Sequence, residues 1–188
     1  MRRSAASAML GTAVALTTSG AVFAGCGPAR DAAARSADSG RAGSAQSSAA
    51  TTRTQQETRS ASEVRRTVQR FYNAFNAHAF GRAPEFTTED WVHINPYGGV
   101  THGRAAVLAE LRQVHETFLK GVTDTPESMD VRFAAPDVAI ATVPGHVTTY
   151  VTPDSVRHEN QRQIRTFVLV RRDGLWRVMQ DQNTIRAP

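Results

Sequence analysis

The sequence predicts an α+β domain in which helices precede a strongly bent antiparallel sheet. Apolar residues recur at helical spacing between residues 60 and 121, which indicates two amphipathic helices. After residue 127 the pattern changes to long segments rich in β-branched residues, separated by turn sequences. Helices followed by a run of strands are typical of the α+β class rather than of an alternating α/β fold.

The folded domain is expected to span residues 61–188. Residues 27–60 contain no Leu, Ile, Val, Met or aromatic side chain and consist mostly of small and polar residues. Such a segment cannot bury enough apolar surface to offset the entropy lost on ordering it, so a disordered linker is expected there. The remaining chain, about 125 residues, has a usual length for one domain.

Residues 1–26 have the layout of an export signal. Two arginines follow Met1, and an uncharged stretch of small and apolar residues leads to Cys26. The sequence Phe-Ala-Gly-Cys at residues 23–26 resembles a bacterial lipobox, in which the cysteine is lipidated and becomes the new N-terminus. We therefore expect an exported lipoprotein, held at the outer face of the cell membrane through Cys26. Secretion after cleavage behind Ala24 is the alternative.

The positive charge of the chain is concentrated ahead of the domain. Residues 1–61 carry seven arginines against three acidic residues, whereas residues 62–188 carry fifteen basic against fourteen acidic residues. The domain also lacks the basic stripe with interleaved aromatic residues that marks a nucleic-acid-binding surface. We therefore expect no nucleic-acid partner.

The first helix is expected to begin near Ser60. Ser60 and Glu63 have capping-box spacing, and the helix should end between His78 and Gly81. Its apolar stripe is formed by Val64, Val68, Phe71, Tyr72 and Phe75.

A short strand at residues 90–96 and a return strand at 100–102 should follow the first helix. They flank a turn at Tyr97, Gly98 and Gly99. A second helix opens at Gly103 and ends near Gly121. Its buried side is expected to carry Val107, Leu108, Leu111, Val114, His115 and Phe118.

Four strands are expected at residues 128–134, 138–152, 156–172 and 175–186, the last two joined by Asp173-Gly174, a strong hairpin signal. A two-residue type I′ turn there places Arg165 and Trp176 on one face of the hairpin and Asp181 on the other. A one-residue bulge would turn Asp181 to the face of Trp176.

Both faces of this hairpin carry apolar residues along their middle stretch. A sheet with one wet face should be polar on that side. The outer face is therefore expected to be covered, most simply by a second subunit.

The domain resembles the SnoaL-like, nuclear transport factor 2-like superfamily and, within it, the SgcJ/EcaC-type group. The resemblance covers residues 62–186. It rests on residues 71–78 (FYNAFNAH), 89–96 (EDWVHINP), 99–104 (GVTHGR), 172–178 (RDGLWRV) and 182–184 (QNT).

This resemblance implies a cone-shaped, cystatin-like roll in which the curved sheet wraps the N-terminal helices and leaves a pocket at the open end. It also implies homodimers through the outer face of the sheet. Members of the group usually have an aspartate after Asn-Ala-His, where this chain has Ala79.

Two groups of side chains are candidates for a pocket. His93 and Asn95 share a strand face with Trp91, and such a pair could orient a carbonyl or move a proton. Polar residues at a wet strand end are the alternative. The predicted hairpin face carries the second group, in which Arg165 could bind a carboxylate: Arg165, Phe167, Gln180 and Gln182. A wet sheet edge is the alternative for this group.

The catalytic candidates are His93 and, if a bulge turns it inward, Asp181. The sequence carries no dinucleotide or phosphate-binding loop and no cysteine or histidine cluster with metal-ligand spacing, so no cofactor and no metal are expected.

Three functions remain open at this point. Ala79 and the lack of a clear acid–base pair favour a module that binds a small, mostly apolar or amphipathic molecule. The alternatives are a cofactor-independent isomerase, dehydratase or cyclase and a dimeric interaction module without an active pocket. An enclosed cavity with His93 or Asp181 buried near a second polar group would favour the enzyme.

Overall fold

The computed structural model describes residues 39–186, so the predicted signal peptide and Cys26 lie outside the described residues. Its helical elements are α1 (Ser39–Asn76), the short 3-10 helix η1 (Ala83–Glu85) and α2 (Arg104–Glu116). The strands are β1 (Thr87–Ile94), β2 (Val100–His102), β3 (Asp124–Pro126), β4 (Asp130–Ala135), β5 (Val138–Val147), β6 (Tyr150–Val151), β7 (Arg157–His158), β8 (Gln161–Arg172) and β9 (Leu175–Ile185).

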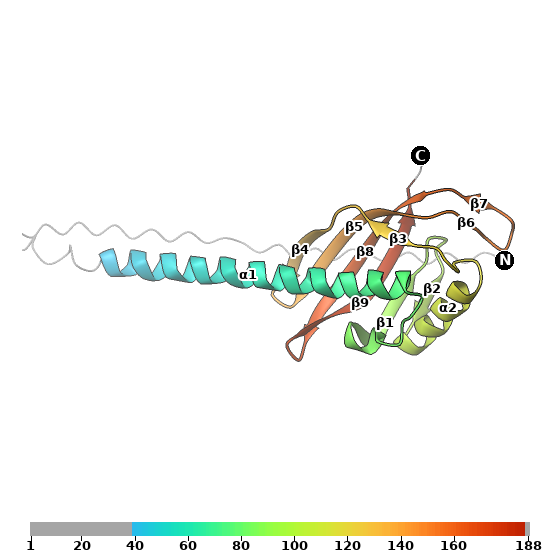
Figure 1. The fold of residues 1–188 in the computed structure, drawn as a ribbon. Coiled ribbons are helices and arrows are strands. Elements are labelled where there is room, and N and C mark those ends of the chain that lie inside the picture. The colour runs from blue at the N-terminus through green and yellow to red at the C-terminus, as the bar shows by residue number, and fades with distance from the viewer. Residues whose placement is uncertain (1–38, 187–188) are drawn as a thin grey trace, which may run out of the picture. The chain divides into compact units, whose positions relative to one another are not determined.

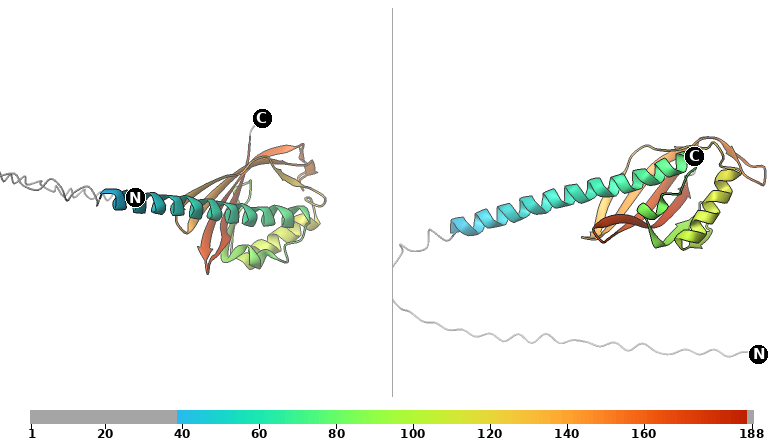
Figure 2. Two further views of the ribbon diagram at one scale, coloured as in Figure 1. Left: turned by 60° about the vertical axis from the view of Figure 1, so that its left-hand side comes forward. Right: turned by 60° about the horizontal axis from the view of Figure 1, so that its bottom comes forward.

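Seven strands form one curved sheet in the order β2-β1-β9-β8-β5-β3, and β4 also pairs with β5 (Figure 1). Every pair is antiparallel except β1 with β9, which is parallel. The sheet curves around the C-terminal half of α1, and α2 lies beside β1 and β2 (Figure 2). The predicted α+β class and the bent sheet are confirmed.

The core lies between α1 and the concave face of the sheet. The predicted helix stripe from Val64 to Phe75 is buried and meets Trp91, Phe167 and Trp176 from the strands. Phe71 contacts Phe167 edge to face, with ring centroids 5.1 Å apart. The apolar spacing of α1 therefore fixes which helix face meets the sheet.

Residues 39–60, which the sequence predicts to belong to a disordered linker, are helical in the structure. Helix α1 begins at Ser39 and passes Ser60, the first buried position, without interruption. Threonines in this stretch donate hydrogen bonds to carbonyls four residues earlier, as Thr52 does to Ser48 and Thr58 to Thr54. Alanine, glutamine, glutamate and arginine have high helix propensity, so a helix here needs no apolar face. No helix within residues 39–186 is long and apolar enough to span a membrane.

The β8–β9 hairpin contains the bulge that relocates Asp181. Near the turn the register is as predicted, with Leu169 opposite Val178. Beyond that pair Val168 lies opposite Gln180, so Met179 is the extra residue in β9. The unbulged register was therefore wrong beyond Val178. Asp181 points to the concave face, whereas Gln180 and Gln182 do not.

The convex face of the sheet carries apolar side chains that are only half-buried. Ile140 of β5 lies opposite Val168 of β8, and Val138 lies opposite Val170. A second subunit on this face stays a prediction.

Candidate functional site

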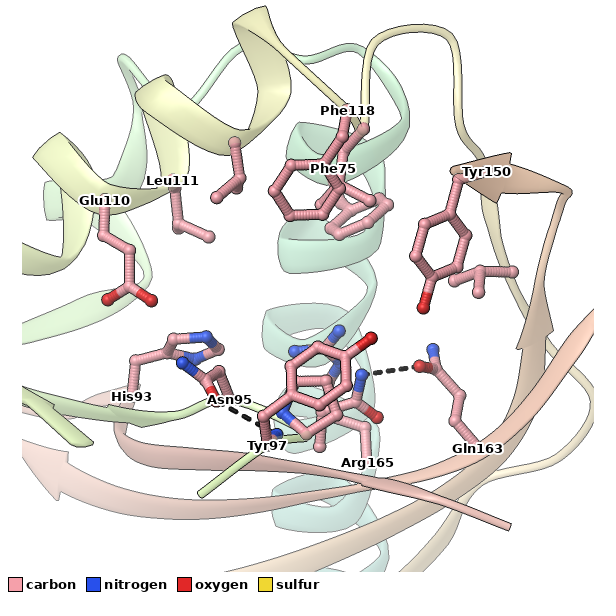
Figure 3. Close-up of a pocket in the computed structure, with 15 residues that line it drawn as sticks. Phe75, His93, Asn95, Tyr97, Glu110, Leu111, Phe118, Tyr150, Gln163 and Arg165 are labelled. Carbon is pink, nitrogen blue, oxygen red and sulfur yellow. Dashed lines mark hydrogen bonds between the residues drawn. The ribbon is translucent and has the colours of Figure 1, made fainter. Parts of the chain in front are cut away.

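A cavity of about 130 Å³ lies on the concave side of the sheet, between α1 and α2 (Figure 3). Its apolar wall is formed by Phe75, Pro96, Tyr97, Leu111, Val114, Phe118, Leu119, Val147 and Tyr150. Its polar residues are His93, Asn95, Gln163, Arg165 and Asn183, with Glu110 facing them from α2. A few polar groups in an otherwise apolar cavity are typical of a site that orients a small molecule.

His93 and Asp181 form a buried pair at the cavity. The side chain of His93 is 8% exposed and that of Asp181 is fully buried. His93 Nδ1 lies 3.0 Å from Asp181 Oδ2 and 3.1 Å from Oδ1. Trp91 Nε1 donates a further hydrogen bond of 2.8 Å to Asp181 Oδ1. Because the carboxylate accepts from Nδ1, it orients the imidazole and leaves Nε2 as the basic nitrogen.

Arg165 lies behind this pair and joins it to a second aspartate. Its Nη1 donates to Asp181 Oδ2 at 2.9 Å, and its Nη2 donates to Asp124 Oδ2 at 3.3 Å. The guanidinium also lies over the ring of Phe71, 5.0 Å from the centroid. Arg165 is 4% exposed, so its charge is balanced within the protein rather than by solvent.

Asp124 is held in place by amides as well as by Arg165. Gln163 Nε2 donates to Asp124 Oδ2 at 2.7 Å, and Asn183 Nδ2 donates to Gln163 Oε1 at 2.6 Å. Asn76, at the end of α1, pairs with the backbone N–H and C=O of Asp124. Asp124 Oδ1 and Asn183 Oδ1 are buried without a hydrogen-bond partner among the described residues.

The pKa values of the two carboxyls are shifted in opposite directions. Burial by itself raises the pKa of Asp181, but His93, Arg165 and the Trp91 N–H more than offset this effect, so the pKa is lowered. Burial also raises the pKa of Asp124, and Arg165 offsets only part of that effect, so the pKa is raised. Asp181 is therefore the ionised partner of both His93 and Arg165.

The structure brings together only some of the predicted site residues. His93, Asn95 and Arg165 line the cavity. Trp91 is buried outside the cavity lining and donates to Asp181, and Phe167 lies in the core beside Phe71. Both terminal nitrogens of Arg165 are engaged by aspartates, whereas its Nε is buried without a hydrogen-bond partner among the described residues.

The placement of Gln180 and Gln182 at a pocket is corrected by the bulge at Met179, since neither side chain lines the cavity. Ala79, where related sequences have an aspartate, is exposed and also lies outside the cavity lining. The carboxylate beside His93 comes instead from β9.

Several residues of the site were not predicted from the sequence. Asp124 lies on β3, a strand of three residues within a segment that reads as a loop. Glu110 lies within the predicted second helix, Phe118 was predicted on the buried side of that helix and Tyr150 in a long strand, but none of them was predicted to line a pocket. No local pattern distinguishes these residues from ordinary helix and strand positions, because their meeting depends on the curvature of the sheet.

Solved structures share this fold. An uncharacterised protein with a cystatin-like fold from Caulobacter vibrioides is 26% identical, with a TM-score of 0.66 over 68% of this chain and 90% of that one. A hexachlorocyclohexane dehydrochlorinase is 13% identical, with a TM-score of 0.60 over 70% and 88%. An NTF2-like protein of unknown function from Pseudomonas putida is 20% identical, with a TM-score of 0.56 over 70% and 88%. The last two likenesses concern the fold alone.

Sequence comparison gives the family. No curated protein sequence matches the chain. The model of the SnoaL-like domain matches residues 68–179, which include the stripe of α1 from Val68 onward, His93, Arg165 and Trp176. This match covers more than half of the chain and agrees with the cystatin-like and NTF2-like folds of the structural neighbours. The chain therefore belongs to the SnoaL-like domain family.

Proposed function

We propose that this domain is an enzyme that removes a proton from a carbon atom of a small, mostly apolar substrate, as dehydratases and isomerases do. The observation that carries the proposal is the contact of 3.0 Å between His93 Nδ1 and Asp181 Oδ2, with His93 lining an apolar cavity. The dehydrochlorinase with this fold carries out an elimination by its name, which makes this reaction class a natural candidate.

In the proposed reaction, His93 Nε2 takes the proton and Asp181 stabilises the imidazolium that forms. Arg165 keeps Asp181 ionised and fixed in position, because it donates to the same oxygen that faces the imidazole. The proton then passes to a leaving group, which is an elimination, or to another carbon, which is an isomerisation. The apolar wall limits the access of water to the carbanion-like transition state.

The same buried groups favour an enzyme over a passive binding module. Burial of Arg165 and Asp181 has a desolvation cost. Binding of an apolar ligand does not require buried charges, so it does not account for this cost. Ionisable groups that are buried, charge-coupled and adjacent to a cavity are typical of acid–base sites. The sequence favoured binding because Ala79 stands where an aspartate is expected. In the structure Asp181 supplies a carboxylate beside His93.

The proposed function can be tested with 5-nitrobenzisoxazole, a neutral aromatic probe that releases a coloured phenolate when a base removes its carbon-bound proton. We expect the wild-type protein to accelerate this elimination over buffer. His93→Asn should lower the rate constant by about a hundredfold or more, because a positioned base contributes on the order of 10²–10⁴.

His102→Asn is the matched control, since His102 is an exposed histidine on the neighbouring strand β2. It should retain the wild-type rate constant. Far-UV circular dichroism of His93→Asn shows whether the fold is kept. Equal rate constants for folded His93→Asn and wild type would refute His93 as the base.

We also propose that the protein is exported, with Cys26 lipidated at the outer face of the membrane and residues 27–38 leading to α1. The lipobox-like sequence supports this location. The domain motifs, among them residues 71–78 and 89–96, support the SgcJ/EcaC-type group as the nearer relatives within the family. Cys26→Ser should release the protein into the medium, measured by fractionation and immunoblotting. Retention of this variant in the membrane would show that the signal region itself is the anchor.

A further inference from the structure

The charges that face the cavity are unbalanced in favour of acids. Its lining contains three ionisable side chains other than tyrosines: His93, Glu110 and Arg165. The positive charge of Arg165 is taken up by Asp181, and Asp124 lies at its other terminal nitrogen. Glu110 is thus the charge on the cavity wall that no basic side chain offsets.

Glu110 lies on α2, on the opposite side of the cavity from the sheet. Its Oε2 accepts a hydrogen bond from Thr101 Oγ1, which fixes the carboxylate. Glu110 forms no ion pair within residues 39–186. Figure 3 shows its carboxylate directed from α2 into the cavity on the side of His93. A half-buried carboxylate without an ion-pair partner attracts a cation.

Aromatic rings form much of the remaining wall. Phe118 and Tyr150 lie with ring centroids 6.3 Å apart and planes inclined by 35°, and Phe75 and Tyr97 complete the group. Burial, reinforced by the neighbouring Tyr97, raises the pKa of the Tyr150 phenol, so this ring stays neutral. The faces of neutral aromatic rings attract a cation and also accept an apolar group.

We propose that the ligand of this cavity carries a protonated amine beside a small apolar group, with the amine held by Glu110 and the apolar group among the four aromatic rings. An anionic ligand is disfavoured, because it would approach Glu110 while both terminal nitrogens of Arg165 are engaged by Asp181 and Asp124. This inference rests on the proposed function in one respect: the same cavity is the substrate site.

The enclosed part of the cavity has room for about one aromatic ring, and the cavity is open to solvent beyond it. An engineered apolar protein cavity of about 150 Å³ holds benzene, and the cavity here measures about 130 Å³. Benzylamine, benzyl alcohol and benzoate therefore form a suitable set of probes. They share one aromatic ring and are cationic, neutral and anionic at neutral pH.

Isothermal titration calorimetry of the three probes at low salt tests the proposal. We expect benzylamine to bind at least about tenfold more tightly than benzoate, which corresponds to about 1.4 kcal/mol, with benzyl alcohol between them. In Glu110→Gln the ratio of the benzylamine and benzoate affinities should fall to within about threefold, since the amide keeps the shape but not the charge.

Glu116→Gln is the matched control, because Glu116 is an exposed glutamate at the end of the same helix and lies outside this cavity lining. It should keep the wild-type ratio. The proposal is overturned if benzoate binds as tightly as benzylamine, if the preference survives in Glu110→Gln, or if none of the probes binds to the folded protein.

The two proposals fail in different ways. A cavity that prefers benzylamine but shows no His93-dependent elimination would keep the ligand class and reject the reaction. A His93-dependent elimination without a preference for benzylamine would keep the reaction and reject the ligand class.

Discussion

Replacing Arg165 with Met should lower the free energy of unfolding by about 3–5 kcal/mol. Methionine can fill the space of the arginine stem, but it leaves the carboxylates of Asp124 and Asp181 buried without their shared cation. Removing one partner of a buried ionic cluster costs far more than removing an exposed one. Urea unfolding followed by tryptophan fluorescence gives the change in free energy.

The pH dependence and a control variant separate this effect from lost packing. Without Arg165 the pKa values of both carboxyls should rise relative to the wild-type protein, so the stability lost in the variant should shrink as the pH falls toward about 4. Arg162→Met, at an exposed position of the same strand, should change stability by less than about 0.5 kcal/mol. A loss below about 1 kcal/mol in Arg165→Met would contradict the picture of Arg165 as the counter-ion of both aspartates.

Asp181→Asn should lower the rate constant for proton removal from 5-nitrobenzisoxazole by about 10²–10⁴. The amide can donate to His93 Nδ1, which moves the imidazole proton to Nε2 and removes the basic lone pair from the cavity. It also leaves a forming imidazolium without its negative partner. The same substitution weakens the Arg165 contact, so the unfolding free energy of this variant must be measured alongside its rate.

Asp173→Asn is the matched control for that substitution. Asp173 lies at the exposed turn of the same hairpin, at a positive φ of 52° that asparagine also tolerates. This variant should retain the wild-type rate constant and stability. If Asp181→Asn keeps the fold and the full rate constant, Asp181 does not position the base.

Much of the fold could be predicted from residue patterns. The stripe from Val64 to Phe75 specifies the buried face of α1, because helical spacing leaves one solution for five apolar side chains. Asp173-Gly174 specifies the tip of the β8–β9 hairpin and the register as far as Leu169 and Val178. The cone-shaped sheet and its pocket were predicted from the resemblance of residues 71–78 and 89–96 to the family.

The central pair of the site could not be predicted in the same way. Apolar residues are frequent in β9 as far as Met179, and the next five residues are polar. The pattern of apolar residues therefore cannot distinguish one strand register from another in this part of β9. A single bulge residue then decides whether Asp181 or Gln182 faces His93. Asp124 was missed because β3 is too short to show a period. The helix before Ser60 was missed because residues 48 and 50–59 are exposed, which leaves helix propensity as the only signal there.

Nitrogen-15 NMR of the His93 imidazole tests whether Asp181 orients His93 as the base. In the neutral form of the ring we expect the proton on Nδ1, hydrogen-bonded to Asp181, and an unprotonated Nε2 whose signal shifts when a ligand enters the cavity. In Asp181→Asn the proton should move to Nε2. A wild-type ring that already carries its proton on Nε2, with Nδ1 bare, would contradict the assignment of His93 as the base that Asp181 orients.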